Sequence, residues 1–124
     1  MTTARILEEG TFDPAQFSDE LARAATNLDV GTRLWLSNDH IRVWEVRLKP
    51  GERGPFHAHT RRYFWTVVDG GTGLQRSSDG TFKVREYRVG ETSYSEHMAE
   101  QPMIHDLENA GETELRFVTV ELLD

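Results

Sequence analysis

Hydrophobic and polar residues alternate with a period of two along most of the chain after Gly31. Successive side chains of an extended strand point to opposite faces, so this alternation predicts β-strands that turn one face toward a core. Clusters of turn-forming residues separate the runs, and one of them, Ser78-Asp79-Gly80, predicts a β-hairpin. The predicted strands are residues 32–37, 40–48, 62–69, 82–89, 103–108 and 114–122.

Many short strands at this spacing predict an all-β fold, either a sandwich or a closed antiparallel barrel. The first part of the chain has a different pattern. Asp13-Pro14-Ala15-Gln16 is typical of a helix start, with Asp as the N-cap and Pro at the first helical position. We therefore expect a short helix at residues 14–26, within an N-terminal arm of residues 1–30, followed by a barrel of residues 31–124.

The composition fits one globular domain. A chain of 124 residues with 37% hydrophobic residues can fill a single core, and we expect Trp35 and Trp44 within it. The chain has no cysteine, which excludes disulfides, thiolate metal sites and cysteine nucleophiles.

The charge balance excludes several classes of partner. There are 14 basic and 21 acidic residues, a net charge of −7, so the chain lacks the basic surface that a nucleic-acid binder or an anionic membrane requires. No run approaches the roughly 18 apolar residues of a membrane span, and the first residues do not resemble a signal peptide. We expect no nucleic-acid or membrane partner and a cytoplasmic location.

Three of the five histidines form a candidate metal site. His57 and His59 are two residues apart, so in a strand both imidazoles point to one face. His105 shares the more apolar face of its strand with Met103 and Leu107, which should point into the barrel. A buried histidine can also be a hydrogen-bonded core residue, but three on inward faces favour a metal ion, because imidazole binds Zn, Fe, Cu and Ni.

At these residues the sequence resembles the cupins. The first cupin motif is G(X)5HXH(X)3–4E(X)6G, and here Gly51, His57-Ala58-His59, Tyr63 and Gly70 follow its spacing, with tyrosine in place of glutamate. The second motif ends in H(X)3N, which His105 to Asn109 reproduces, although Pro102 stands where the family has glycine. The resemblance covers residues 31–123.

The resemblance implies an antiparallel β-barrel, or jelly roll, with one metal ion inside, usually bound by three His and one Glu. Carried over to this chain, His57, His59 and His105 are the metal ligands, and the carboxylate is missing. Tyr63 is then a phenolate ligand, a hydrogen-bond donor beside the metal, or an ordinary barrel residue, and it is the candidate catalytic side chain. A three-His site is similar to that of the thiol dioxygenases. It implies one divalent transition metal, Fe(II) by preference, with Zn, Ni, Mn and Cu also compatible.

Other side chains near the motif are candidates for binding a substrate. Arg61 and Arg62 either pair with a substrate carboxylate or belong to a solvated turn. Trp65 has the same strand parity as Tyr63, so it is expected to line the cavity. His97 is either an acid or base that covers the site or an exposed loop histidine. Glu45 either replaces the missing carboxylate, if it points inward, or forms a surface salt bridge.

These observations lead to two functional hypotheses. The first is a dioxygenase-type enzyme that acts on a small organic acid or thiol, and the second is a non-catalytic cupin that binds a small ligand, with the metal structural or absent. The motifs also resemble, more narrowly, small bacterial cupins assigned to β-alanine degradation. Phe64, Thr66 and Val68 form an apolar face opposite Tyr63, and we expect a homodimer that covers this face.

Overall fold

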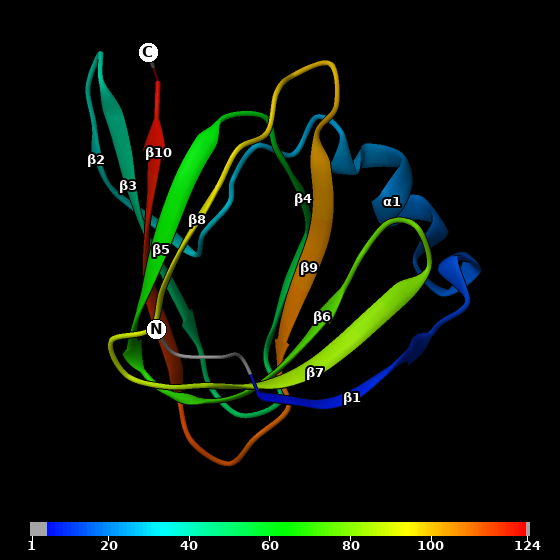
Figure 1. Ribbon diagram of the computed structural model, residues 1–124. Helices are drawn as coiled ribbons and strands as arrows, with labels where there is room; N and C mark the ends of the chain where they lie inside the picture. The colour runs from blue at the N-terminus through cyan, green and yellow to red at the C-terminus, as the bar shows by residue number, and fades with distance from the viewer. Residues whose placement is uncertain (1–4, 124) are drawn as a thin grey trace.

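The computed structural model describes residues 5–123 and consists of two five-stranded antiparallel sheets that face each other (Figure 1). One sheet has the order β1-β7-β6-β9-β4 and the other the order β2-β3-β10-β5-β8. In the first sheet the strands are β1 Arg5–Thr11, β4 Arg53–His59, β6 Gly71–Arg76, β7 Thr81–Tyr87 and β9 Met103–Asn109. In the second they are β2 Arg33–Ser37, β3 Ile41–Leu48, β5 Arg62–Asp69, β8 Thr92–Ser95 and β10 Leu115–Leu122.

The predicted all-β fold is confirmed, and all six predicted strands are present with small shifts at their ends. The predicted hairpin at Ser78-Asp79-Gly80 joins β6 to β7, where Ser77 N–H donates to the Thr81 carbonyl and Gly80 takes a positive φ of 92°. Over residues 5–123, no helix is long and apolar enough to cross a membrane.

The alternation did not reveal strands β1, β4, β6 and β8. The side chains of β1 are exposed on both faces, so this strand has no alternating pattern. Strand β6 contains Gly71 and Gly73, and a Cβ atom on Gly73 would lie 2.6 Å from Cε2 of the Tyr87 ring. A glycine is therefore required there so that the aromatic ring can lie against the strand.

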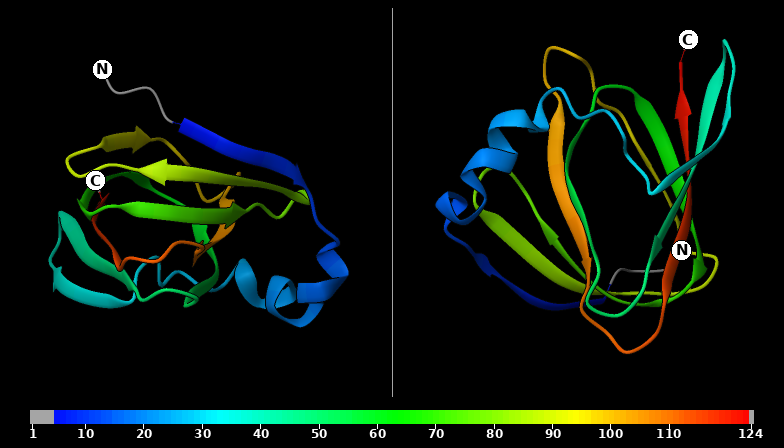
Figure 2. Two further views of the ribbon diagram at one scale, coloured as in Figure 1. Left: turned by 90° about the horizontal axis from the view of Figure 1, so that it is seen from below. Right: turned by 180° about the vertical axis from the view of Figure 1, so that it is seen from behind.

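The predicted helix is found as two successive helices, the 3-10 helix η1 Pro14–Phe17 and the α-helix α1 Ser18–Ala24. Asp13 caps the first, because its Oδ1 accepts a hydrogen bond of 3.0 Å from Ala15 N–H. Helix α1 lies outside the barrel next to β4 and β9 (Figure 2). The division into an arm and a barrel remains an interpretation of the sequence, and β1 is an edge strand of the first sheet.

The core between the sheets is mainly aromatic and aliphatic. Val67, Tyr87, Leu115 and Phe117 are buried against one another, and Val46, Trp65 and Leu107 pack around them. Trp44 is buried as predicted, but the prediction for Trp35 is wrong. Trp35 lies on the edge strand β2 at the bulge in its pairing with β3, and it is 48% exposed.

The outer face of the second sheet carries a row of apolar side chains across all five strands. Neighbouring members of this row are Cα partners in the strand pairing. They are Leu36, Val43, Val120, Phe64 and Tyr94. The homodimer expected from the sequence would cover this face, and the dimer itself stays a prediction.

A buried carboxylate fastens α1 to the first sheet. Asp106 on β9 is 0% exposed and accepts hydrogen bonds from Arg53 Nε at 2.7 Å and from Arg76 Nη1 at 2.9 Å. Arg53 on β4 also donates through Nη2 to Glu20 of α1 at 2.7 Å. The two guanidinium groups lie against the Phe17 ring, at 4.6 Å and 5.1 Å from its centroid. One carboxylate thus links β4, β6 and β9, and through Arg53 the helix.

Replacing Asp106 with asparagine should destabilise the protein strongly, because the partly buried Arg53 and Arg76 lose the counter-charge that they share. We expect Asp106→Asn to lower the free energy of unfolding by about 3 kcal/mol or more, measured by urea denaturation. The control is Glu86→Gln, which removes the exposed pair with Arg5 and should change stability by less than about 1 kcal/mol. Equal effects of the two substitutions would contradict the role assigned to Asp106.

A second buried carboxylate, Glu121, should make the stability of the protein depend on pH, and replacing it should raise stability at neutral pH. Glu121 is 3% exposed and accepts a hydrogen bond of 2.7 Å from Trp44 Nε1, and burial raises the pKa of its carboxyl group. A carboxyl whose folded-state pKa is raised stabilises the fold below its unfolded pKa, and this contribution is lost as the pH rises through the folded value. Glu121→Gln keeps an acceptor for Trp44, so it should be more stable than wild type at pH 7.

The difference in the free energy of unfolding between Glu121→Gln and wild type should shrink near pH 4, where the wild-type carboxyl takes up its proton. Urea denaturation at both pH values measures it, with the exposed Glu112→Gln as the control. A less stable Glu121→Gln protein at pH 7 would show that the charges of Arg42 and Arg61 outweigh the cost of burial.

Candidate metal centre

The three histidines of the motif meet on the inner face of the first sheet. His57 and His59 lie two residues apart on β4, and His105 on β9 is the Cα partner of His57. The predicted convergence is confirmed: the side chains form one cluster whose candidate ligand atoms lie within 4.8 Å of one another. Asp106, the next residue on β9, points to the opposite face, into the arginine network.

The spacing of the imidazole nitrogens suits a single metal ion. His59 Nε2 lies 3.0 Å from His57 Nε2 and 3.0 Å from His105 Nε2. The ring centroids are 4.8 Å apart in all three pairs, with interplanar angles between 71° and 82°. Ligands about 2.1 Å from one ion lie about 3.0 Å apart at right angles and about 3.4 Å apart in a tetrahedron. The two distances that involve His59 Nε2 are those of adjacent ligands at right angles.

The protonation of the cluster also suits a metal ion. Burial lowers the pKa of His57, His59 and His105, so the rings are neutral. The Nδ1 of His57 lies 2.9 Å from the Pro55 carbonyl oxygen, which fixes the proton on Nδ1 and leaves the Nε2 lone pair free. The Nε2 atoms of all three rings converge on one point, and a cation bound there would accept a lone pair from each.

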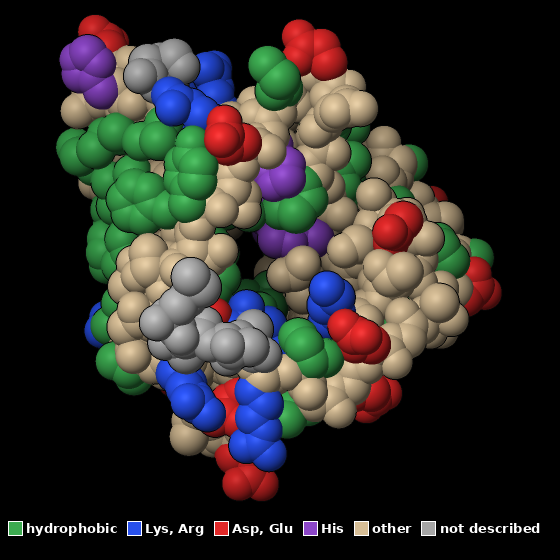
Figure 3. Space-filling model, in the orientation of Figure 1, with side chains coloured by type: hydrophobic (Ala, Val, Ile, Leu, Met, Phe, Trp, Pro, Cys, Tyr) green, Lys and Arg blue, Asp and Glu red, His purple; other side chains and the backbone are tan. Residues whose placement is uncertain are grey.

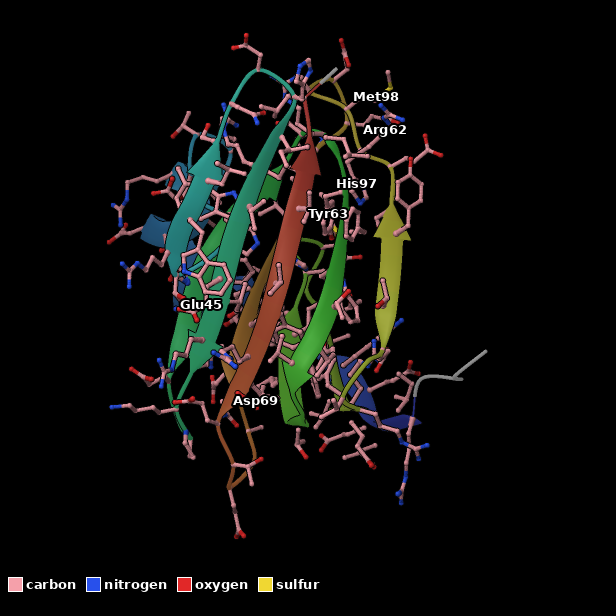
Figure 4. All side chains as sticks on the ribbon, turned by 90° about the vertical axis from the view of Figure 1, so that its left-hand side faces the viewer. Glu45, Arg62, Tyr63, Asp69, His97 and Met98 are labelled. Carbon is pink, nitrogen blue, oxygen red and sulfur yellow. The ribbon has the colours of Figure 1, made fainter. Side chains whose placement is uncertain are left out.

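No carboxylate of residues 5–123 belongs to this cluster. Glu45, the possible replacement, lies on the outer face of β3, and its Oε2 is 3.8 Å from Arg116 Nη1 (Figure 4). The Tyr63 ring stacks on His59 with a centroid distance of 4.0 Å and an interplanar angle of 15°. Burial raises the pKa of Tyr63 to about 12 despite a hydrogen bond with Ser95, so the phenol stays protonated. This geometry favours a role beside the ligands over a phenolate ligand.

Comparison with solved structures identifies the architecture. A cupin domain from Bordetella pertussis Tohama I matches with a TM-score of 0.63 and 22% identity, covering 73% of this chain and 88% of that one. A protein with a double-stranded β-helix domain from Klebsiella pneumoniae matches with a TM-score of 0.58 and 17% identity, covering 90% and 87%. The protein has the cupin fold. No protein-family model and no curated protein matches the sequence.

A third similar structure is a predicted oxalate decarboxylase from Thermotoga maritima, with a TM-score of 0.52 and 21% identity over 73% of this chain and 77% of that one. At these identities the likeness establishes the fold alone. A cupin barrel supports many functions, so the function of this one has to be argued from its site.

The cupin barrel contains a cavity of about 420 Å³ in front of the three histidines. Most of its wall is apolar or aromatic, and Trp65 lines it as the strand parity predicted. Histidine side chains border a hollow on the face shown in Figure 3, and basic side chains lie across from them. The segment after α1 forms one side of the wall, where Ala58 N–H donates to the Asn27 carbonyl at 2.9 Å.

The other predicted binding residues, Arg61, Arg62 and His97, are not among the residues that line the cavity, and their roles stay predictions. Among the described residues, neither Arg61 nor Arg62 lines the cavity; Arg61 is exposed and its Nη1 donates to the Leu123 carbonyl at 3.3 Å. Figure 4 shows Arg62 near Met98 at one end of the barrel. The His97 ring is 5.9 Å from Tyr63 and 6.4 Å from His59, and burial lowers its pKa.

Sequence reasoning missed Arg85, which lines the cavity from β7. Its guanidinium carbon lies 4.2 Å from the Tyr87 ring centroid and 5.8 Å from that of Trp65. Tyr87, two residues further along β7, also lines the cavity. The sequence did contain a signal for Arg85. It lies two residues before Tyr87, so the two side chains share one face of the strand, and an arginine that points inward needs a specific partner.

Removal of one histidine should abolish tight metal binding. We expect wild type to bind about one Zn²⁺ per chain in isothermal titration calorimetry, and His105→Ala to bind it at least about 100-fold more weakly. His40→Ala changes an exposed histidine at the β2–β3 turn and should bind as wild type does. Equal affinity of the two variants would show that the cluster is not the metal site.

Proposed function

We propose that this cupin is a mononuclear metal-dependent enzyme of the dioxygenase type that acts on a small organic acid or thiol. The supporting observation is the set of three neutral imidazoles, spaced for one ion, at the wall of an otherwise mostly apolar cavity. His57, His59 and His105 would hold one divalent metal, with Fe(II) preferred. When bound, iron supplies a coordination site for substrate and activates O₂.

The absence of a carboxylate ligand bears on this proposal. Three neutral ligands leave the full charge of a divalent ion in the site, and three ligands leave further positions open, as in catalytic sites. A dioxygenase reaction places both atoms of one O₂ in the product, so a thiol RSH becomes a sulfinic acid RSO₂H and no further reductant is needed.

The surrounding residues would bind and orient the substrate. Tyr63 stacks on His59 and therefore restricts the rotation of that imidazole. Its phenol keeps its proton over the physiological range, because its pKa is raised to about 12, and can donate a hydrogen bond. The mostly apolar wall excludes water around a bound substrate, which strengthens each electrostatic contact inside. The narrower resemblance to cupins of β-alanine degradation stays a prediction.

The test combines metal analysis with O₂ uptake. Elemental analysis of purified, untagged protein should find about one iron per chain, which the His57→Ala/His105→Ala double variant should lack. Iron-loaded wild type should consume O₂ with a member of a series of small acids and thiols, and the double variant should consume none. Bound iron without O₂ uptake across the series would support the alternative, a non-catalytic ligand-binding cupin with a structural metal.

Absence of metal, even after anaerobic loading, would contradict the metalloenzyme proposal. The ligand would then be held by the shape and polarity of the cavity alone. Tyr63→Phe separates the roles of the tyrosine, because it keeps the ring stacked on His59 and removes only the hydroxyl group.

A further inference from the structure

Strand β10 places a carboxylate on the inward face of the barrel. Buried and half-buried residues alternate along this strand, and its inward face carries Phe117, Thr119 and Glu121. Phe117 and Thr119 line the cavity, whereas Glu121 is not among the lining residues and is 3% exposed. A glutamate is rarely buried in a barrel without a partner, because taking its charge out of water is costly. The position of Glu121 therefore needs an explanation.

The strand register puts Glu121 beside the tyrosine that lies on a predicted metal ligand. Glu121 is the Cα partner of Tyr63 in the pairing of β10 with β5, and both residues are buried. Directly opposed residues on one face of an antiparallel pair have Cβ atoms about 5 Å apart. The Tyr63 ring in turn stacks on the His59 ring with a centroid distance of 4.0 Å. One side chain thus connects the carboxylate to the histidine cluster.

The contacts of Glu121 do not offset the cost of burying its charge. Its Oε1 accepts a hydrogen bond of 2.7 Å from Trp44 Nε1, which is an uncharged donor. The charged groups that face it are two cations, Arg42 and Arg61, and one further anion, Asp29. Burial outweighs these contacts and raises the pKa of the Glu121 carboxyl group. The ionised form is therefore costly in the metal-free protein, and a buried charge of this kind is typical of functional sites.

A divalent ion at the histidines would supply the missing counter-charge. The imidazoles of His57, His59 and His105 are neutral, and no carboxylate among residues 5–123 joins their cluster. Asp106, the buried carboxylate on the other side of β9, is already paired with two arginines. Glu121 has an uncharged hydrogen-bond partner instead. Opposite charges attract more strongly in a partly desolvated interior than in water, and salt screens buried charges less.

We propose that Glu121 balances the charge of the bound metal ion through space, from β10, in place of the glutamate that the first cupin motif puts among the ligands. Glu121 is neither a ligand nor a substrate contact, since it lies outside the ligand cluster and outside the cavity wall. The inference rests on the proposed function only for the presence of a metal ion, and it holds for whichever reaction that ion supports.

The test measures metal affinity and stability in the same variant. The probe is Zn²⁺, because it carries two charges and has no redox chemistry. At pH 7, Glu121→Gln should bind Zn²⁺ about 5- to 50-fold more weakly than wild type in isothermal titration calorimetry. Its metal-free form should nevertheless be the more stable one in urea denaturation. A residue needed only for packing would not lower metal affinity while raising the stability of the metal-free protein.

Two variants serve as matched controls. Glu45→Gln removes a buried carboxylate from the neighbouring strand β3, on the outer face of the same sheet, where its Oε2 lies 3.8 Å from Arg116 Nη1. It should bind Zn²⁺ within about twofold of wild type, because its charge lies on the far side of the sheet. Glu121→Asp keeps the charge on the inward face, so it should recover most of the zinc affinity that Glu121→Gln loses.

An ion of lower charge distinguishes charge balance from an effect on the shape of the site. A through-space attraction is proportional to the charge of the ion, so its loss lowers the binding free energy of a monovalent ion by half as much. The fold-loss of Cu⁺ affinity in Glu121→Gln, measured anaerobically by competition with a chelator, should therefore be about the square root of the loss for Zn²⁺. An equal fold-loss for the two ions would overturn the proposal.

The proposal is also overturned if Glu121→Gln binds Zn²⁺ as tightly as wild type, or if Glu45→Gln loses as much affinity as Glu121→Gln does. Either result leaves the metalloenzyme proposal to its own test, because the wild-type protein still binds the ion. A wild-type protein that binds neither Zn²⁺ nor Cu⁺ overturns both proposals together, and this outcome is distinguished from the others by the wild-type titration alone.

Discussion

The buried carboxylate of Asp106 is the interaction on which the arrangement of this site depends. It lies on β9 directly after His105, and because strand side chains alternate, one residue points into the cavity while the next points to the outside. There Asp106 binds Arg53 of β4 and Arg76 of β6, the strands on either side of β9. A shift of β4 against β9 would break these bonds, so the network that attaches α1 also fixes the register that brings His57 opposite His105.

Desolvation then determines the chemistry of the inner face. The same burial that keeps the three imidazoles neutral also keeps Tyr63 and Tyr87 protonated, because removal from water disfavours every charged form. The cavity wall thus presents neutral nitrogen donors and neutral phenols. Arg85, Arg53 and Asp29 are the charged residues that line it among the described residues, and each arginine has a carboxylate partner. The inner face therefore offers donor atoms at one end and a hydrogen-bonding cation at the other.

The sequence predicted those parts of this arrangement that follow from local rules. Alternation placed His57, His59 and Trp65 on inward faces, and the spacing of the histidines was sufficient to predict their cluster with His105. Local rules did not reveal Arg85, because its role comes from Tyr87, Trp65 and a loop residue, Glu91, that meet only in the folded barrel. They also missed four strands, β1, β4, β6 and β8; β1 is exposed on both faces, and β6 needs glycine beside Tyr87. Arg61 and Arg62 were conspicuous because they adjoin the motif, but adjacency in sequence did not place them in the cavity wall.

The tyrosine in place of the usual carboxylate and the arginine across the cavity have related electrostatic consequences. A carboxylate ligand would reduce the charge that a divalent ion brings into the barrel, whereas three neutral imidazoles leave it whole. Across the cavity Glu91 already balances the charge of Arg85, so the excess positive charge of a bound ion would lie at the histidine end. A ligand with an anionic donor atom, such as a thiolate or an alkoxide, at the metal would reduce that excess. The same apolar wall that makes an uncompensated charge costly would then make such a ligand bind tightly, which connects the missing glutamate to the choice of substrate.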